Sequence, residues 1–496
     1  MPENKSNAHP AVILGPTQLL INGNWEPSAS GETLDVECPA NRKIICSVPR
    51  ADSEDVNKAV AAADKAFPAW SRVSTSDRGR ILLRIADAIE GRAEELARIV
   101  AHETGNAIRT QSRMEAYGCA AIFRYFGGLS NELKGTTYPS TEDVLCYTRR
   151  EPLGVVAAIV PWNAPVSLAS AKMAPALCAG NSVVLKAAED APLGILWLAS
   201  ICSQFLPPGV LNVLTGYGAE CGSALVHHPK VNKVSFTGST AVGQGIIQAS
   251  AERVTPFSLE LGGKSPTIVF DDSDNQMVVE NVALAMRFTR QSQSCTAGSR
   301  LFIRENIFDS FLEKLCAHVN SLVMGDPLDE STDTGTIINK KQFDRVCNYI
   351  KVGQETAGVQ LITGGLPPEK GPWSQGYFIK PTVFSSHSND WKLAREEIFG
   401  PVLTVIPWHK EEDVIRMAND THYGLAGFIF SKDTARAIRV AHQIDAGWIQ
   451  VNQGKGQSIG QPYGGYKQSG IGKEFSLDSM IDSYSKLKSV TVNLGI

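Results

Sequence analysis

Two short polar segments near the middle of the chain hold an acid and a thiol whose chemistry is complementary. Glu260 lies in SLELGGKSP (258–266), and Cys295 lies in SQSCTAGSR (292–300). A cysteine thiolate can add to a carbonyl carbon, and a nearby carboxylate can activate the water that later releases the product. The pair indicates covalent acyl chemistry, although spacing alone leaves a buried, inert thiol as the alternative for Cys295.

The remaining cysteines give no sign of a disulfide framework or a zinc site. The chain has 10 cysteines and no C-x-x-C pair, a pattern that favours reduced thiols. Four of them lie in apolar or helix-like stretches and are predicted to be buried and inert, namely Cys119, Cys178, Cys202 and Cys347. We predict no metal.

Length and composition predict a multidomain globular protein. A chain of 496 residues exceeds what one hydrophobic core usually organises. The formal net charge of -4 leaves no basic field for nucleic acid. The first ten residues lack an apolar signal core, and apolar runs such as 192–202 are too short to cross a bilayer. We therefore expect a cytoplasmic protein with no nucleic-acid or membrane partner.

Segments of helical and strand character alternate along the chain, which predicts an α/β fold with a largely parallel sheet. Apolar spacing predicts a helix that begins at Asp52 or Ser53, and a second amphipathic helical run from Ile81 to Ile99. The apolar runs 155–161 and 182–186 are predicted to be buried strands that flank a helix at 172–181.

A turn rich in Gly, Ser and Thr has the features of an anion site. In KVSFTGSTAVG (233–243) a predicted strand enters this turn and then a helix. Backbone N–H groups at a helix start favour phosphate, and Gly238 permits close approach. The spacing is not G-x-G-x-x-G, so an ordinary strand-to-helix turn is the alternative. Lys186 and Glu189 could bind the hydroxyls of a ribose, or form a solvated surface pair.

Several motifs, in one order along most of the chain, carry a resemblance to a known family. They are PWNAP (161–165), KMAPALCAGNSVVLKAAE (172–189), FTGSTAVG (236–243), LELGGKSP (259–266), SCTAGSR (294–300), EEIFGPV (396–402), NDTHYGLAG (419–427) and PYGGYKQSGIGKE (462–474). In these motifs the sequence resembles the aldehyde dehydrogenase superfamily, in its hydrolytic, NAD(P)-dependent branch.

The resemblance implies three structural parts. A Rossmann-type dinucleotide-binding domain would comprise residues 1–131 and 152–259, and an α/β catalytic domain residues 260–474. A small β oligomerisation arm would comprise residues 132–151 and 475–496, where 136–149 and 483–494 alternate like strands. We therefore expect a homo-oligomer, a dimer or a tetramer.

The resemblance also implies catalytic roles. Cys295 would attack an aldehyde to form a thiohemiacetal, whose oxyanion would be held by the Asn163 side-chain amide and the Cys295 backbone N–H. Glu260 would deprotonate the water that hydrolyses the resulting thioester. Lys172 and Glu474 match positions associated with proton relay; a surface lysine and a helix-end glutamate are the alternatives.

For the cofactor, the resemblance implies contacts along the whole dinucleotide. They are Ile159, Pro161 and Trp162 along the nucleotide, Lys186 and Glu189 at the adenosine ribose, Gly218, Phe236, Gly238, Ser239 and Val242 around the pyrophosphate and adenine, Glu397 and Phe399 at the nicotinamide ribose and ring, and Gln342 as a further ribose contact. A carboxylate at Glu189 accepts from a free 2′-hydroxyl and repels a 2′-phosphate, which favours NAD over NADP.

The chain departs from the family pattern just before the nucleophile. Arg290 and Ser292 stand where an Asn and a Gly are common. Arg290 could lower the pKa of the thiol, pair with an acid elsewhere, or serve as a structural arginine. A CoA-acylating relative typically lacks the glutamate found here at 260, and a non-catalytic structural relative would lack Cys295, Asn163 or Glu260.

The expected substrate tunnel has small side chains on one wall. Ala164, Val166, Ser167 and Ala171 stand where many relatives carry aromatic residues, which predicts a wide tunnel and a bulky aldehyde substrate, aromatic or branched. The alternative is a semialdehyde with a distal carboxylate, bound by Arg113, Arg290 or Lys455. These three cations could equally be solvated.

Overall fold

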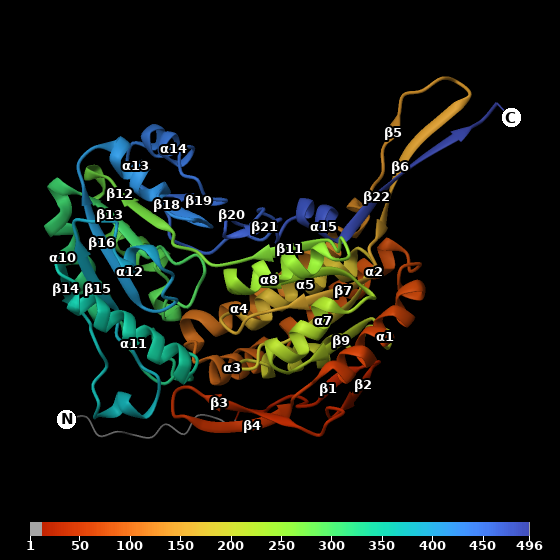
Figure 1. Cartoon of the computed structure of the whole chain (residues 1–496), viewed down its shortest axis with the longest axis horizontal. Helices are drawn as coiled ribbons and strands as arrows, with labels where there is room; N and C mark the ends of the chain where they lie inside the picture. The colour runs from red at the N-terminus through yellow and green to blue at the C-terminus, as the bar shows by residue number, and fades with distance from the viewer. Residues whose placement is uncertain (1–11, 496) are drawn as a thin grey trace.

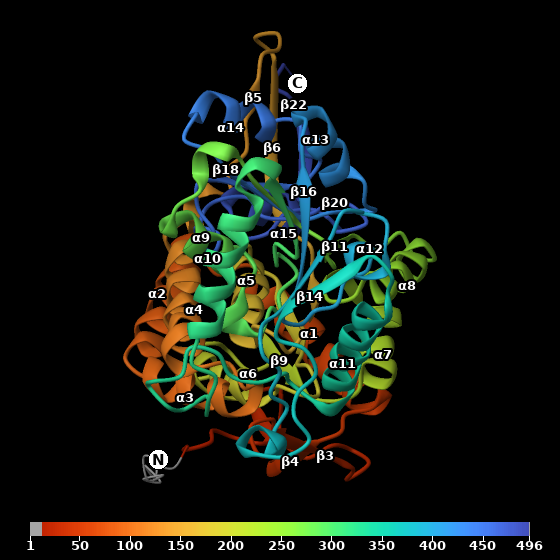
Figure 2. The same ribbon diagram turned by 90° about the vertical axis from the view of Figure 1, so that its left-hand side faces the viewer.

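The computed structural model describes residues 12–495, which form two lobes and a projecting arm (Figures 1 and 2). Each lobe is an α/β layer structure around its own sheet, so the predicted fold class is confirmed. Residues 1–11, at the start of the predicted dinucleotide-binding domain, and residue 496, at the end of the predicted arm, lie outside the described residues.

The first sheet, on the right in Figure 1, has the strand order β2-β1-β9-β8-β7-β10-β11-β21. Its central strands, from β9 to β11, run parallel, while β1 and β21 pair antiparallel with the two sides of this block. The strands are β1 (Leu19–Ile21), β2 (Asn24–Glu26), β7 (Val155–Ile159), β8 (Ser182–Lys186), β9 (Leu211–Leu214), β10 (Val231–Thr237), β11 (Phe257–Glu260) and β21 (Gly470–Ile471).

Helices cover both faces of this sheet. One face packs against α1 (Ser53–Trp70), α7 (Ser223–His227) and α8 (Thr240–Ala251), and the other against α2 (Thr75–Glu90), α3 (Ala93–Thr104), α4 (Arg113–Gly128), α5 (Pro165–Cys178) and α6 (Leu193–Cys202). Strand β7 shows why its sequence is apolar throughout. Val155 and Ala157 enter one core while Val156 and Ala158 enter the other, because successive side chains point to opposite faces.

The second sheet has the order β14-β15-β16-β13-β12-β18-β19 and is parallel except for β14. Its strands are β12 (Pro266–Val269), β13 (Arg300–Arg304), β14 (Val359–Thr363), β15 (Thr382–Ser386), β16 (Val402–Trp408), β18 (Ala426–Phe430) and β19 (Trp448–Val451). Its helices are α9 (Gln276–Ala285), α10 (Phe308–Ser321), α11 (Lys340–Glu355), α12 (Lys392–Arg395), α13 (Glu411–Asn419) and α14 (Thr434–Ala441).

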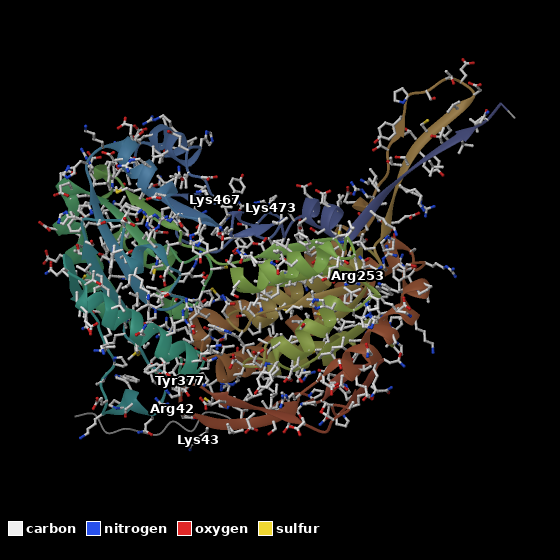
Figure 3. All side chains as sticks on the ribbon, in the orientation of Figure 1. Arg42, Lys43, Arg253, Tyr377, Lys467 and Lys473 are labelled. Carbon is white, nitrogen blue, oxygen red and sulfur yellow. The ribbon has the colours of Figure 1, made fainter. Side chains whose placement is uncertain are left out.

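The two lobes touch through segments that cross between them. A hairpin of β3 (Thr33–Cys38) and β4 (Lys43–Pro49) places the Arg42 guanidinium 4.8 Å from the centre of the Tyr377 ring in the other lobe (Figure 3). Strands β17 (Tyr423–Gly424) and β20 (Tyr466–Lys467) pair beside β21, where Figure 3 marks Lys467 and Lys473 midway between the lobes. The second lobe therefore adds β21 to the first sheet.

The arm is a three-stranded antiparallel sheet that projects from the body (Figure 1). It consists of β5 (Thr137–Tyr138), β6 (Val144–Pro152) and β22 (Ser485–Asn493), and α15 (Leu477–Tyr484) leads directly into β22. The strand predicted at 483–494 corresponds to β22, whereas the segment predicted as one strand at 136–149 is a hairpin in which residues 139–143 separate β5 from β6. Tyr138, Leu145 and Leu487 are 52%, 41% and 50% exposed on it, so the arm carries apolar side chains without a cover in one chain.

Most predicted elements agree with the structure, and one helix prediction was wrong. Asp52 caps α1 through a hydrogen bond to the backbone N–H of Glu54. The amphipathic run from Ile81 to Ile99 is two helices rather than one, because α2 ends at Gly91, a poor helix former, and α3 begins after Arg92. Helix α5 begins earlier than predicted, with Pro165 at its first position.

The carboxyl ends of the parallel strands gather predicted site residues in one row. Ile159 of β7 pairs with Lys186 of β8 on one side and with Phe236 of β10 on the other. One step further along β10, Thr237 pairs with Glu260 of β11. Ligands of open parallel sheets bind beyond this edge, where connecting loops and helix N-termini converge. The fold thus places residues separated by up to 101 positions at one edge.

A buried asparagine ties the start of this sheet to the arm. Asn181 Oδ1 accepts the backbone N–H groups of Leu153 at 2.7 Å and Gly154 at 3.1 Å. Its Nδ2 donates to the carbonyls of Ala176 at 3.1 Å and Tyr484 at 2.8 Å. This side chain is fully buried, so its loss would leave the backbone groups of Gly154 and Tyr484, both buried, without these partners.

We predict that Asn181→Ala lowers the free energy of unfolding by about 3 kcal/mol or more, because four hydrogen bonds to buried backbone groups are lost. Denaturant unfolding followed by far-UV circular dichroism measures the change. The matched control is Asn320→Ala at an exposed position, where a change within about 0.5 kcal/mol is expected. Equal stability of the two variants would contradict the prediction.

Candidate active site

Cys295 lies on a tightly bent loop between α9 and β13. Gln291 and Ser292 have φ of +51° and +50°, a left-handed conformation that glycine adopts most easily. The Gln291 amide holds this bend by donating to Thr334 Oγ1 at 3.0 Å and to the Gly335 carbonyl at 2.7 Å. The loop also packs on Gly263, where a Cβ would lie 2.2 Å from the Cys295 carbonyl oxygen.

The Cys295 sulfur is within hydrogen-bond distance of one hydroxyl group. Its Sγ lies 3.3 Å from Tyr463 Oη. Burial raises the pKa of the Cys295 thiol to about 11, while the tyrosine bond acts in the opposite direction. Tyr463 is held by edge-on contacts with Trp448 and Phe475, so this hydroxyl is positioned by packing. The thiol is therefore mainly protonated near neutral pH.

Asn163 stands next to the same loop, at the start of α5. Its side-chain Nδ2 donates to the Gln293 backbone carbonyl at 2.9 Å, and its backbone carbonyl accepts from Asn106 Nδ2 at 3.2 Å. These bonds hold the Asn163 amide against Gln293, the residue two positions before Cys295. An amide nitrogen carries two donors, and the second has no hydrogen-bond partner among the described residues, so it is available to a ligand.

Glu260, Lys172 and Glu474 form a buried charged cluster. Lys172 Nζ donates to Glu474 Oε1 at 2.5 Å and to Ser235 Oγ at 3.2 Å. Burial, followed by the neighbouring Glu474 carboxylate, raises the pKa of Glu260 well above its ordinary value, and the Lys172 charge opposes this. The Glu260 carboxylate packs against Gly464, where a Cβ would lie 2.6 Å from Oε1. Lys172 and Glu474 are thus neither surface nor helix-end residues.

The predicted adenosine-ribose residues are not a solvated surface pair. Lys186 Nζ lies 3.0 Å from Glu189 Oε2, but the lysine side chain is only 4% exposed and the glutamate 38% exposed. The amine is therefore held inside the sheet edge while the carboxylate reaches the surface. Ser239 caps α8 by accepting the Val242 N–H at 3.4 Å, and the Gly238 N–H donates to the Glu260 carbonyl at 3.0 Å.

The other predicted cofactor residues come from both lobes. Gly218 begins a turn of π-helix (Gly218–Gly222), where it is exposed, and Pro161 follows the end of β7. Trp162 meets the Phe399 ring edge-on, with 5.4 Å between ring centres, which joins the two lobes across the site. Gln342 donates to the carbonyls of Ile398 at 3.0 Å and Phe399 at 2.9 Å, so its amide supports the Phe399 segment.

Glu397, a residue of the second lobe, lies near the loop that carries Cys295. Its Oε1 accepts the Gly263 N–H at 2.9 Å, and burial raises its pKa to about 7. A small cavity beside Cys295 is lined by Gly263, Ser292, Ser294, Glu397 and Phe399. The predicted nicotinamide residues are therefore next to the predicted nucleophile.

Arg290 pairs with an acid and does not act on the thiol. Its Nε donates to Gln111 Oε1 at 3.0 Å, and Nη2 lies 3.9 Å from Glu115 Oε2. Glu115 in turn accepts the backbone N–H groups at the start of α5, including that of Val166 at 3.1 Å. Of the alternatives from the sequence, the structure supports a structural arginine paired with an acid.

The tunnel wall and its cations differ in part from the expectation. Ser167 faces Gly118 of α4, where a Cβ would lie 3.8 Å from the serine oxygen, so both sides are small. Val166 is fully buried and packs against Gly194 of α6. Arg113 bonds to Glu94 at 2.8 Å and Glu330 at 2.6 Å, so its guanidinium is already engaged by two carboxylates.

Two residues of the site were missed by sequence reasoning. Tyr463 lies in the motif at 462–474 but was given no role, because its bond to Cys295, 168 positions away, depends on packing against Trp448 and Phe475. Arg287 donates to the carbonyls of Gly454 at 2.7 Å and Lys455 at 3.0 Å and so fixes that loop. An arginine after an apolar helix carries no signal for such a contact.

Other features of the described chain bear on its class. All 10 cysteines are free thiols; Cys119, Cys178 and Cys202 are buried, and Cys347 is half-buried. Among residues 12–495, no group of three His, Cys, Asp or Glu side chains is placed to hold a metal ion. No helix in that range is long and apolar enough to cross a membrane.

Comparisons with known proteins agree with this geometry. The aldehyde dehydrogenase family matches residues 25–490. The chain is 41% identical to an aldehyde dehydrogenase of Aspergillus niger, over 97% of this chain and 96% of that protein. The structure of PnpE from Pseudomonas sp. WBC-3 superposes with a TM-score of 0.94 at 40% identity, covering 97% of this chain and 98% of that one.

A third relative was solved with its cofactor. Betaine aldehyde dehydrogenase of Staphylococcus aureus, in complex with NAD+, superposes with a TM-score of 0.94 at 34% identity, covering 97% of this chain and 95% of that one. PnpE has also been solved with nicotinamide adenine dinucleotide. The chain therefore belongs to the aldehyde dehydrogenase family, whose members are oxidoreductases that oxidise aldehydes with a nicotinamide cofactor.

Proposed function

We propose that this enzyme oxidises an aldehyde to the carboxylic acid through an acyl intermediate on Cys295, with NAD as the cofactor and water as the final nucleophile. One observation carries this proposal. The Asn163 amide bonds to the loop that carries Cys295, and the Cys295 thiol lies 3.3 Å from the Tyr463 hydroxyl. Glu260 is buried close enough for its charge to affect both groups.

In the first half-reaction, the Cys295 sulfur attacks the aldehyde carbon. A thiol with a pKa of about 11 keeps its proton until the carbonyl arrives, so the S–H bond breaks as the carbon–sulfur bond forms and the proton passes to water in the site. The oxygen becomes an oxyanion, which the free Asn163 amide donor and the Cys295 backbone N–H stabilise. Bound NAD would supply the acceptor for the hydride that leaves this thiohemiacetal.

In the second half-reaction, water adds to the thioester carbon and the carbon–sulfur bond breaks. Glu260 accepts a proton from that water, and its raised pKa makes the carboxylate a stronger base than an exposed glutamate. The leaving sulfur takes the proton of the new acid, so the products are the carboxylate and the Cys295 thiol, and the proton on Glu260 is left to be released. CoA-dependent release is disfavoured because the water-activating glutamate is present.

The rim of the first sheet fits a dinucleotide. The N-terminus of α8, capped by Ser239, directs backbone N–H groups outward, as pyrophosphate binding requires. The buried Lys186 amine and the half-exposed Glu189 carboxylate would bind the adenosine ribose hydroxyls. Glu397, Phe399 and Trp162 would surround the nicotinamide end, with Gln342 supporting Phe399 from behind.

We propose the domain boundaries given by the sequence, and a homo-oligomer built through the arm. The exposed apolar side chains of β5, β6 and β22 support assembly with a second copy, dimer or tetramer, because an uncovered strand edge favours a partner. Ten free thiols support a reducing compartment, and we propose the cytoplasm.

Removal of the two reacting groups should separate the two half-reactions. Cys295→Ala should abolish NADH formation, because no thiohemiacetal forms. Glu260→Gln should leave a burst of about one NADH per active site and slow later turnover by about a hundredfold or more, because the thioester is not hydrolysed. Stopped-flow absorbance of NADH measures both, with and without added CoA. A Glu260→Gln enzyme that turns over normally would refute the assigned base.

Glu189 should set the preference for NAD. In Glu189→Ala the carboxylate no longer repels a 2′-phosphate, so the ratio of kcat/KM for NAD to that for NADP should fall by about tenfold. Steady-state kinetics with both cofactors measure this ratio, and Glu252→Ala at the far end of α8 is the control that should leave it unchanged. An unaltered ratio in Glu189→Ala would count against the ribose assignment.

We propose a bulky aldehyde, aromatic or branched, as substrate. The small side chains of Ala164, Ser167 and Gly118 support it, because a Cβ at Gly118 would meet only the Ser167 oxygen, at 3.8 Å. The carboxylate-bearing alternative has less support, because Arg113 and Arg290 already face carboxylates.

The tunnel hypothesis predicts that kcat/KM does not fall from acetaldehyde to benzaldehyde. Ser167→Phe should lower kcat/KM for benzaldehyde about tenfold and leave acetaldehyde within about threefold, because the added ring occupies the space of the larger substrate. Ser30→Phe, on an exposed turn, should change neither value. A wild-type kcat/KM that declines steadily with aldehyde size would exclude a wide tunnel.

A further inference from the structure

A buried lysine outside the predicted machinery lies on the strand that supports the charged cluster. Lys233 is only 3% exposed and stands on β10, two residues before Ser235. Side chains alternate along a strand, so these two residues share a face, while Val234 and Phe236 enter the apolar core on the opposite face. A lysine at this position is costly to bury unless its charge is used or released.

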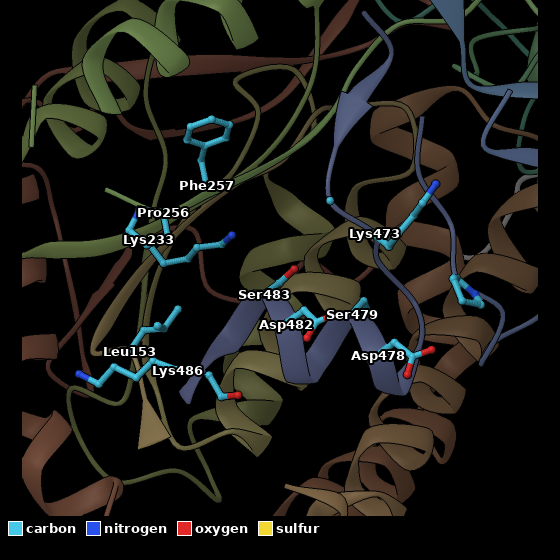
Figure 4. A pocket seen from close by; sticks show the side chains of 13 residues that line it. Leu153, Lys233, Pro256, Phe257, Lys473, Asp478, Ser479, Asp482, Ser483 and Lys486 are labelled. Atoms are coloured by element: carbon cyan, nitrogen blue, oxygen red, sulfur yellow. The ribbon is translucent and has the colours of Figure 1, made fainter. Parts of the chain in front are cut away.

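Lys233 lines a cavity of about 660 Å³ that leads to the protein surface (Figure 4). In the figure its amine points from β10 toward α15. The far side of the cavity includes Asp478, Asp482 and Lys486, all three exposed, so water has access from that side. Lys233 therefore stands between bulk water and the interior of the first sheet.

On the inner side, a hydrogen-bonded cluster joins this strand to β11, the strand that carries the proposed base. Ser235 Oγ accepts from Lys172 Nζ at 3.2 Å and lies 3.4 Å from Glu474 Oε1. Ser258 stands on β11, two residues before Glu260, and its hydroxyl donates to Ser235 Oγ at 3.3 Å. Glu260 and Glu474 each keep one carboxylate oxygen, Oε2, that is buried and has no hydrogen-bond partner among the described residues.

We propose that Lys233 is the proton-relay residue through which the proton of the hydrolytic water leaves this cluster for the water-filled cavity. The proposal rests on the function proposed above. One water O–H bond breaks as the carbon–oxygen bond forms, and the proton moves to Glu260. It passes through the Glu474–Lys172 pair to the neutral Lys233 amine, and from the resulting ammonium to water in the cavity. Glu260 is then a carboxylate again for the next turnover.

Electrostatics agree with this assignment. Burial, followed by the Lys172 charge, lowers the pKa of Lys233 to about 7, while Glu474 opposes the shift. Near neutral pH the amine can therefore both accept and release a proton, whereas an ordinary lysine would stay charged. The charged groups facing it are Lys172 on α5, Lys473 and Glu474 beside β21, Asp478 and Asp482 on α15, and Lys486 on β22.

The test compares Lys233→Met, Lys233→Ala and the control Lys486→Met, which lines the same cavity at its exposed side. In both Lys233 variants the NADH burst should keep its amplitude and rate, while steady-state turnover falls about tenfold or more. Adding ethylamine or propylamine to Lys233→Ala should restore turnover. The restored rate should rise with the concentration of the neutral form of the amine, because only that form can accept a proton. Lys486→Met should behave as the wild type.

The pH profile gives the sign. Lys233 accepts a proton only when neutral, so turnover limited by deacylation should fall as the pH drops below about 7 in the wild type. Glu397 also titrates near that value, so the amine rescue, which a structural role would not produce, identifies the lysine. Unchanged turnover in Lys233→Met, a burst lost together with turnover, or no response to amines would each overturn the relay. A Glu260→Gln enzyme without any burst would instead refute the proposed function itself.

Discussion

The site depends on keeping a carboxyl group and a thiol out of water while leaving each a way to exchange protons. Burial alone raises the pKa of both Glu260 and Cys295, because it penalises their charged forms. The protein opposes this with the Lys172 ammonium on one side and the Tyr463 hydroxyl on the other. Reactivity then comes from groups that become charged only when a substrate or a water requires it.

The parallel sheet makes this arrangement possible. Its strands are apolar on both faces, so it can be covered on both sides, and polar chemistry is confined to strand ends and to a few exceptions within the strands. Ser235 is such an exception: it sits inside β10, where its hydroxyl joins α5, β11 and α15. A single serine thus brings together side chains that lie far apart in the sequence.

Much of the fold followed from the sequence because its signals were local. Apolar runs and caps gave β7, β8 and α1, and alternation gave the strands of the arm. The prediction of one helical run from Ile81 to Ile99 was wrong, because the apolar spacing continues across the break between α2 and α3 at Gly91. Arrangement in space was less accessible: Tyr463, Arg287 and the packing of Val166 against α6 depend on contacts between distant segments.

The catalytic residues were assigned through family resemblance rather than through the residues alone. Spacing by itself left Cys295 as one thiol among ten, and it gave Lys172 no reason to be buried. The structure supplies what spacing lacks, since it puts Lys172 at 0% exposure against Glu474 and places Glu260 in the same electrostatic cluster. Residues that act on one another through burial leave little trace in a single sequence.

Tyr484 stands at the boundary between the body and the arm. Its hydroxyl donates to Ser235 at 3.2 Å, its carbonyl accepts from Asn181, and β22 begins at the next residue. A force on the arm of the proposed homo-oligomer would therefore act through this one residue on the serine that joins the charged cluster. Assembly and the proposed turnover would share this mechanical anchor.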